Sequence, residues 1–144
     1  MDYFSNIANE MGLHTNKQIG EIKPGDKNLD IRGIIVCQIS KNTLKNEQKI
    51  RQVLIADMTG SIHCNFFDEV GEKLNEGDVI FLKNAYASVF KNNLILYANK
   101  PGYGQVVKVG EYFMIYNEQP NLSIASWKKI IDDKSGLISY ALDG

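Results

Sequence analysis

Apolar and polar residues alternate in short runs between about residues 29 and 98, and turn-forming residues separate these runs. Alternation over four to eight residues is typical of a β-strand with one buried face. A single helical turn, capped by Asp68, is expected over residues 69–74. Lys91, Asn92 and Asn93 predict a tight hairpin. Five strands are predicted, over residues 29–39, 49–57, 61–67, 79–90 and 94–98.

Five strands with a short helix between the third and the fourth is the element order of the OB-fold. We therefore expect an all-β protein, with a single five-stranded OB-fold barrel over residues 18–122 and short flanking helices. Residues 1–17 are an N-terminal extension in which a short amphipathic helix is expected. Residues 123–144 are a C-terminal tail, whose apolar spacing predicts a helix over residues 124–133.

A glycine interrupts the first predicted strand. Apolar residues alternate at Leu29 and Ile31, and the alternation then moves to Ile34 and Val36 on the far side of Gly33. A glycine at such a shift predicts a β-bulge, which would bend the strand around a barrel corner.

Four aromatic residues are predicted on outward strand faces, because side chains alternate between the two faces of a strand. They are Phe67, Tyr86, Phe90 and Tyr97. Stacking of a nucleobase on an exposed aromatic ring contributes about 1–3 kcal/mol, so this face suits single-stranded nucleic acid. Two other interpretations stay open. The rings could be cross-strand pairs that only stabilise the sheet, or the tail helix or a partner protein could cover them.

Charge changes this picture only slightly. The net charge is −1, from 16 basic and 17 acidic residues, which favours base stacking over extensive phosphate neutralisation. A few cations lie near the ends of the predicted strands, where they could meet phosphates. These are Arg51, Lys83, Lys91 and Lys100.

Other chemistry is not indicated. Cys37 and Cys64 lie in apolar runs without zinc-ligand spacing, so we expect two buried free thiols and neither a metal nor a cofactor. Asp57, Asp68 and Asp78 occupy turns or caps, where aspartate has a structural role, so no enzyme is expected. Neither a membrane-spanning segment nor a secretory signal is expected.

Several segments, in order along the chain, carry a family resemblance: residues 22–25, 56–62, 67–71, 77–80 and 108–112. The most specific segment is residues 86–91 (YASVFK), followed at the matching distance by residues 94–97. From about Gln18 to about Ser123, the chain resembles the B subunits of the SOSS complex, a sensor of single-stranded DNA. It also resembles the related simple single-stranded-DNA-binding proteins of archaea.

The resemblance implies a non-catalytic protein that binds single-stranded DNA in DNA damage signalling and repair. It implies stacking on Tyr86, Phe90 and Tyr97, with Phe67 at a position where the family usually has tryptophan. It further implies a large helical scaffold subunit as partner, docking near Glu111 and Tyr112. Nuclear localisation is expected for a eukaryotic source and cytoplasmic localisation otherwise. Because stacking is indifferent to the sugar, single-stranded RNA stays open as an alternative ligand.

Overall fold

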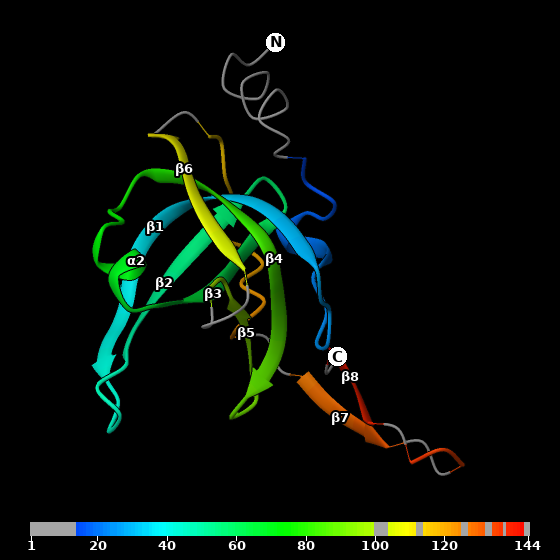
Figure 1. Cartoon of the computed structure of the whole chain (residues 1–144). Helices are drawn as coiled ribbons and strands as arrows, with labels where there is room; N and C mark the ends of the chain where they lie inside the picture. The colour runs from blue at the N-terminus through cyan, green and yellow to red at the C-terminus, as the bar shows by residue number, and fades with distance from the viewer. Residues whose placement is uncertain are drawn as a thin grey trace.

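The computed structural model describes residues 14–99, 104–111, 114–124, 127–131, 134–136 and 138–142. Figure 1 shows a strongly bent sheet that curls into a barrel, with a smaller hairpin beside it. A short 3₁₀ helix, η1 (Ile19–Glu21), precedes the barrel. The barrel elements are β1 (Leu29–Thr43), β2 (Lys49–Asp57), β3 (Gly60–Phe67), α2 (Glu69–Glu72), β4 (Asp78–Phe90), β5 (Asn93–Tyr97) and β6 (Gln105–Glu111).

The main sheet has the strand order β1-β2-β3-β5-β4-β6, and an additional pairing of β1 with β4 closes the barrel. The β3 and β5 strands are parallel, while the other pairs are antiparallel. The predicted all-β OB-fold is confirmed, including the helix between the third and fourth strands. The sequence prediction missed β6, which extends the sheet along β4 after β5 ends.

Inward-facing residues fill the barrel. Phe66, Ile31, Ile55, Ile62 and Leu96 are among the largest side chains that are fully buried there. Burying a side chain of this size stabilises the fold by roughly 1.5–3 kcal/mol relative to its exposed form. This packing determines which face of each strand points into the barrel and which face is on the outer surface.

The bulge predicted at Gly33 is wrong. Leu29, Ile31 and Ile35 all belong to the core, so the inward parity continues through Gly33. The register shifts of β1 against β2 lie later, between Ile35 and Cys37 and between Gln38 and Ser40. A Cβ atom at Gly33 would lie 3.3 Å from the carbonyl oxygen of Ala56, so the glycine allows close approach where β1 passes from β4 to β2.

The single turn of α2 is present, but Asp68 does not cap it with its side chain. Asp68 has a φ of 57°, and its carboxylate accepts a hydrogen bond from the backbone N–H of Lys49 (3.1 Å). Asp68 therefore ties the end of β3 to the start of β2. Among the described residues, no helix is long and apolar enough to cross a membrane.

The tail holds a strand where the sequence predicts a helix. The β7 strand (Trp127–Ile131) pairs antiparallel with β8 (Ile138–Leu142) in a separate two-stranded sheet. Isoleucines at 130, 131 and 138 favour strands, and Gly136, with a φ of 71°, suits the connection between them. The helix predicted in the N-terminal extension lies outside the described residues.

Both cysteines are free thiols, as predicted, but they differ in burial. Cys64 is fully buried in the core, and burial raises the pKa of its thiol. Cys37 is only half-buried, and burial raises its thiol pKa as well, together with the nearby charge of Glu118. Neither thiol is poised to act as a nucleophile.

Candidate nucleic-acid interface

Three aromatic side chains lie side by side on the outer face of β3, β5 and β4. Tyr97 of β5 is directly opposite Tyr86 of β4, and the two ring centroids are 4.9 Å apart at an interplanar angle of 13°. Phe67, near the end of β3, stacks with Tyr97 at a centroid distance of 6.4 Å and 19°. We call Phe67, Tyr97 and Tyr86 the aromatic row.

Nearly parallel rings at 4.9 Å form an offset stack, so Tyr86 and Tyr97 each cover part of the other's face. Both side chains remain half-buried. Burial raises the pKa of the Tyr97 hydroxyl, as does the nearby Tyr86. The outer parts of these two rings are left for a ligand.

Phe67 lies on the predicted face, but the prediction that it is an open platform is wrong, because only 6% of its surface is exposed. Tyr97 packs near its ring, and the Asn99 side chain holds its backbone. Asn99 Oδ1 accepts from the N–H of Phe67 (2.9 Å), and Asn99 Nδ2 donates to its carbonyl oxygen (3.1 Å). Phe67 thus supports Tyr97 from the side of β3.

Phe90 is the open ring of the site, with 58% of its surface exposed. It lies on the same face of β4 as Tyr86 and pairs with Asn93 across the hairpin. The Lys91 ammonium is 5.4 Å from the Phe90 ring centroid. Lys91 and Asn92 have φ values of 50° and 69°, which is the geometry of a type I′ hairpin turn, so the predicted tight hairpin is confirmed.

Uncharged polar side chains lie next to the aromatic row, on β2 and β3. Gln52 Nε2 donates a hydrogen bond to Asn65 Oδ1 (2.9 Å), and Asn65 is beside Tyr97 in the pairing of β3 with β5. His63 follows on the same face of β3. Burial lowers the pKa of its imidazole, so the ring is neutral at pH 7.

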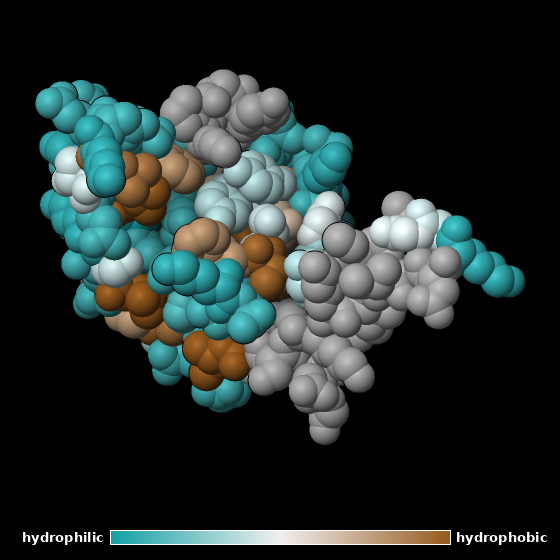
Figure 2. Space-filling view, turned by 90° about the horizontal axis from the view of Figure 1, so that it is seen from below, coloured by the Kyte–Doolittle hydropathy of each residue, from teal (hydrophilic) through white to brown (hydrophobic). Residues whose placement is uncertain are grey.

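Two hairpins flank this face on the same side of the barrel, as Figure 1 shows for the β1–β2 and β4–β5 connections at the lower edge of the view. Figure 2 looks onto that side and shows apolar surface in separate patches among hydrophilic surface. The exposed apolar side chains of these hairpins are Ile39, Leu44 and Phe90. Lys41 and Lys45 are exposed on the β1–β2 hairpin, a pair of cations that the sequence analysis did not single out.

Arg51 does not belong to this face, in contrast to the prediction. It pairs with Phe66, whose side chain is in the core, so it points away from the outer face that holds Phe67. Its guanidinium donates to the carbonyl oxygens of Gly71 (2.6 Å) and Leu74, and to Gln38 Oε1 (2.9 Å). Arg51 therefore fastens the α2 segment across one end of the barrel.

The other predicted site residues are dispersed. Lys83 is exposed on β4, opposite Gln105 of β6, and Lys91 is exposed at the hairpin. Glu111 is exposed at the end of β6 and forms an ion pair with Lys108 (2.6 Å). Lys100 and Tyr112 lie outside the described residues.

The aspartates that could suggest catalysis have structural partners. Asp57 accepts from the N–H groups of Ile19 and Thr59, each at 2.8 Å. Asp78 accepts from the N–H of Asn75 (2.8 Å) and forms an ion pair with Lys108 (3.2 Å). Within the described residues, no group of three His, Cys, Asp or Glu side chains could hold a metal ion.

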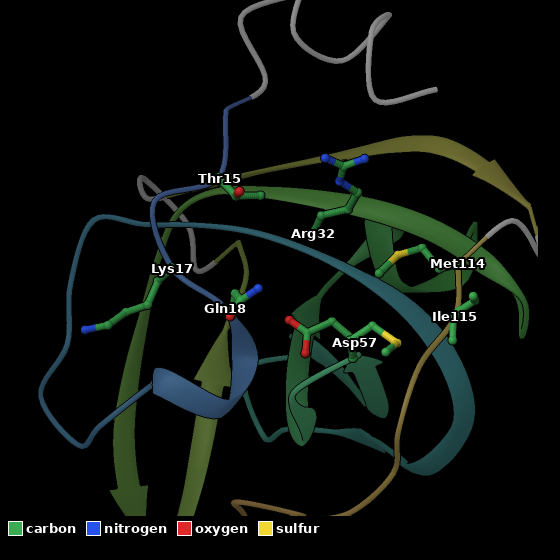
Figure 3. Close-up of a pocket in the computed structure, with 8 residues that line it drawn as sticks. Thr15, Lys17, Gln18, Arg32, Asp57, Met114 and Ile115 are labelled. Atoms are coloured by element: carbon green, nitrogen blue, oxygen red, sulfur yellow. The ribbon is translucent and has the colours of Figure 1, made fainter. Parts of the chain in front are cut away.

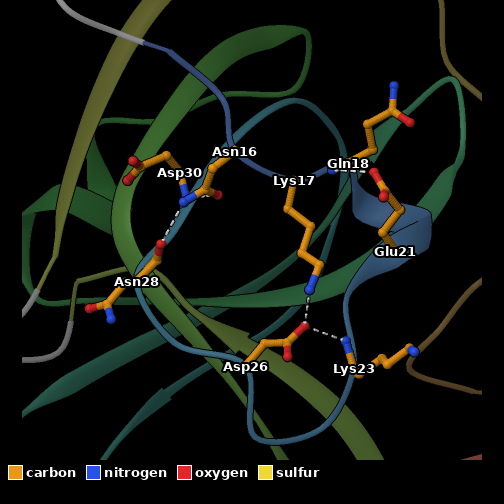
Figure 4. Close-up of polar contacts among 8 residues, drawn as sticks. All are labelled: Asn16, Lys17, Gln18, Glu21, Lys23, Asp26, Asn28 and Asp30. Carbon is orange, nitrogen blue, oxygen red and sulfur yellow. Dashed lines mark hydrogen bonds and ion pairs between the residues drawn. The ribbon is translucent and has the colours of Figure 1, made fainter.

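A separate pocket of about 200 Å³ shares no lining residue with the aromatic row. Figure 3 shows Arg32, Asp57 and Met114 among the side chains that surround it, from β1, β2 and the segment after β6. Figure 4 shows the polar contacts that fix the adjoining N-terminal segment, including the ion pair of Lys17 with Asp26 (2.9 Å). The pocket is therefore a second feature, distinct from the aromatic face.

Residues 31–108 match the protein family described as "Single-stranded DNA binding protein Ssb-like, OB fold". The match covers more than half of the chain. The chain belongs to this family. The aromatic row, Phe90 and the hydrogen-bonded pair of Gln52 and Asn65 all lie within the matched residues of this Ssb-like domain. The family is broader than the SOSS B subunits, and the resemblance to those subunits stays a prediction.

Solved structures share the fold of this Ssb-like domain. A hypothetical protein from Arabidopsis thaliana has a TM-score of 0.64 and 18% identity, covering 81% of this chain and 88% of that chain. The replication factor A related protein from Methanobacterium thermoautotrophicum has a TM-score of 0.51 and 25% identity, covering 65% and 92%. A domain of replication protein A from Methanococcus maripaludis has a TM-score of 0.52 and 17% identity, covering 64% and 94%.

Proposed function

We propose that this domain binds single-stranded DNA without catalysis, by stacking bases on Phe90 and on the outer parts of Tyr86 and Tyr97. The observation that carries the proposal is the position of Phe90. Its ring is 58% exposed and lies on the same strand face as the stacked tyrosines, in a domain of the Ssb-like family. A base that covers such a ring removes apolar surface from water at little conformational cost.

The distribution of charge supports stacking as the main source of affinity. Lys91 and, on the other hairpin, Lys41 and Lys45 lie at the rim, while Arg51 is half-buried and bonded to the α2 segment. About three phosphate contacts would give a slope of roughly −2 in a plot of log K against log salt concentration, using about −0.7 per phosphate for a single strand. A shallow salt dependence is therefore expected.

A protein-interaction module that uses the same face is the second candidate. The stacking of Tyr86 on Tyr97 favours this second candidate, because each ring already covers part of the other's apolar face without a nucleic acid. In that case Phe90 would insert into a pocket of a partner protein. Single-stranded RNA is a third possible occupant, since a stacking face does not distinguish the sugars.

The wider role that we propose is in DNA damage signalling and repair, with a large helical scaffold subunit as partner and nuclear localisation in a eukaryotic cell. Its support is the resemblance of the segments around residues 86–91 and 108–112. The exposure of Glu111 at the end of β6 is compatible with docking at that end of the sheet.

The test is fluorescence anisotropy of labelled oligo-dT titrated with the whole chain. Unlabelled duplex DNA and RNA of matched length serve as competitors. The proposal predicts saturable binding that duplex DNA displaces poorly and single-stranded DNA displaces well. No binding to oligo-dT would refute it and leave the protein-interaction module, whereas stronger competition by RNA would make RNA the ligand.

A further inference from the structure

The side chains of Gln52 and Asn65 form an uncharged, hydrogen-bonded amide pair next to Tyr97. Residues Gln52, Asn65, Tyr97 and Tyr86 follow one another in register across β2, β3, β5 and β4. Neighbouring strands are about 4.8 Å apart, so a group on Asn65 is within reach of the edge of a base stacked on Tyr97. Tyr86 stacks on Tyr97 from the side of β4 and Phe67 from the side of β3, so a base would stack on the outer part of the Tyr97 ring, which Asn65 adjoins in the pairing of β3 with β5.

The hydrogen bond within the pair leaves a defined donor. Asn65 Oδ1 is occupied by Gln52 Nε2, and Asn65 Nδ2 has no partner among the described residues. No described side-chain nitrogen or oxygen is both buried and without a partner, so Asn65 Nδ2 reaches solvent although Asn65 is only 9% exposed. The Gln52 bond fixes which end of the Asn65 amide faces outward.

The absence of charge around this donor sets the orientation of a ligand. In this part of the face, Gln52, Asn65 and the neutral His63 carry no charge, whereas the exposed Lys41, Lys45 and Lys91 lie on the two hairpins. Phosphates are attracted to the hairpins, so bases would face the sheet with their edges toward the amide pair.

We propose that Asn65, held in place by Gln52, donates a hydrogen bond to a carbonyl oxygen of the base stacked on Tyr97. This inference rests on the proposed function of the same face. Thymine, cytosine, guanine and uracil each carry an exocyclic carbonyl, and adenine carries none. The domain therefore disfavours adenine at this position, beyond any effect of stacking.

The experiment compares binding of oligo-deoxyinosine and oligo-deoxyadenosine of matched length, at concentrations where both are single-stranded. Hypoxanthine and adenine are both purines, but only hypoxanthine has a carbonyl at C6. The wild type is expected to bind the inosine oligomer about two- to tenfold more tightly, the range for one hydrogen bond. The ratio of the two dissociation constants is then measured in variants, so that differences in self-stacking of the oligomers cancel.

Asn65→Asp keeps the acceptor for Gln52 and replaces the outward donor with an acceptor. The variant is expected to reverse the ratio, because a carboxylate accepts from the adenine amino group and repels a carbonyl. Ser88→Asp is the matched control: Ser88 is exposed on β4 between Tyr86 and Phe90, so the new charge weakens binding of both oligomers and leaves the ratio unchanged. Gln52→Leu, which releases the Asn65 amide, should lower the ratio toward one, and it preserves the test if Asn65→Asp does not fold.

Equal binding of the two oligomers by the wild type would overturn the inference. So would a ratio that Asn65→Asp and Gln52→Leu leave unchanged while circular dichroism shows them folded. Either result would leave the proposed function standing, provided that oligo-dT binds. Failure of the wild type to bind oligo-dT, oligo-dI and oligo-dA would refute the proposed function itself, and the inference with it.

Discussion

Replacing Phe90 with alanine separates binding from folding more cleanly than any other change on the aromatic face. The ring is 58% exposed at the end of β4, and it contacts the Lys91 ammonium at 5.4 Å. Truncation of a core phenylalanine costs about 3–5 kcal/mol of unfolding free energy. Because most of the Phe90 ring is already in water, its loss should cost on the order of 1 kcal/mol, including an exposed cation–π contact of about 0.5–1 kcal/mol.

The expected loss of binding is larger. One stacked base contributes about 1–3 kcal/mol, so Phe90→Ala should raise the Kd for oligo-dT by about 5- to 150-fold. Met58→Ala is the matched control, because Met58 is 57% exposed but lines the separate pocket. Its effect on stability should be similarly small, with no change in Kd.

Fluorescence anisotropy gives the Kd values, and urea unfolding gives the free energy of unfolding for the same three proteins. An unchanged Kd in Phe90→Ala would refute the assignment of Phe90 as a stacking platform. A loss of several kcal/mol of stability would also contradict the reasoning, because it would show that the ring is structural. Equal weakening by Phe90→Ala and Met58→Ala would mean that general exposure of apolar surface, and not this face, determines binding.

Three further predictions concern the surroundings of the face. Leucine substitutions at Tyr86 and Tyr97, singly and together, should give a coupling energy of about 0.5–1.5 kcal/mol in urea unfolding, and a coupling near zero would contradict the stack. Arg51→Ala should lower the free energy of unfolding by about 1.5–3 kcal/mol and leave the Kd of the folded protein unchanged. An unchanged stability with a raised Kd would show that Arg51 contacts the nucleic acid. Burial lowers the pKa of His63 below its ordinary value of 6.5, so its contribution to stability is present above pH 6.5 and lost as the pH falls through the folded-state pKa. Thermal unfolding between pH 7.5 and 5.5 should therefore depend less on pH in His63→Gln, and parallel curves would argue against a buried neutral imidazole.

Much of the barrel could be predicted because its strands have one buried and one outer face. The second strand was predicted at 49–57, the bounds of β2. The predictions for β3 and β4 differ from the structure by one residue at the start, and the prediction for β5 is shifted by one residue at both ends. Parity along β4 correctly put Tyr86 and Phe90 on the face opposite Ala85 and Ala87. Such alternation is a local property, so a single sequence is sufficient to reveal it.

Features that depend on contacts between distant segments were not predictable in this way. The bond of Asn99 to the Phe67 backbone joins residues 32 positions apart and holds a residue that parity alone left exposed. Arg51 lies near lysines in the sequence, but its partners are carbonyl groups around α2. The end of β1 pairs polar residues with β2, and residues 41–43 are exposed, so residues 40–43 lack the apolar alternation that identifies a strand.

The tail shows a different limitation. Apolar residues at 124, 127, 130 and 131 fit a helical period, but residues 127–131 are also rich enough in isoleucine to form a strand. A short segment of this kind is ambiguous until its partner is known, and here the partner is β8. The β6 strand was missed for a similar reason, since its pairing with β4 and not its own pattern defines it.

The most direct test of the central claim is to record the aromatic ring proton resonances of Phe90, Tyr86 and Tyr97 by NMR while oligo-dT is added. Stacked bases produce ring-current shifts, so the account predicts upfield shifts of the Phe90 ring and of the outer tyrosine protons that saturate with binding. The methyl resonance of Met58, in the separate pocket, should stay in place. Saturable binding without shifts of these rings would contradict base stacking on this face and would show that the nucleic acid binds another surface of the domain.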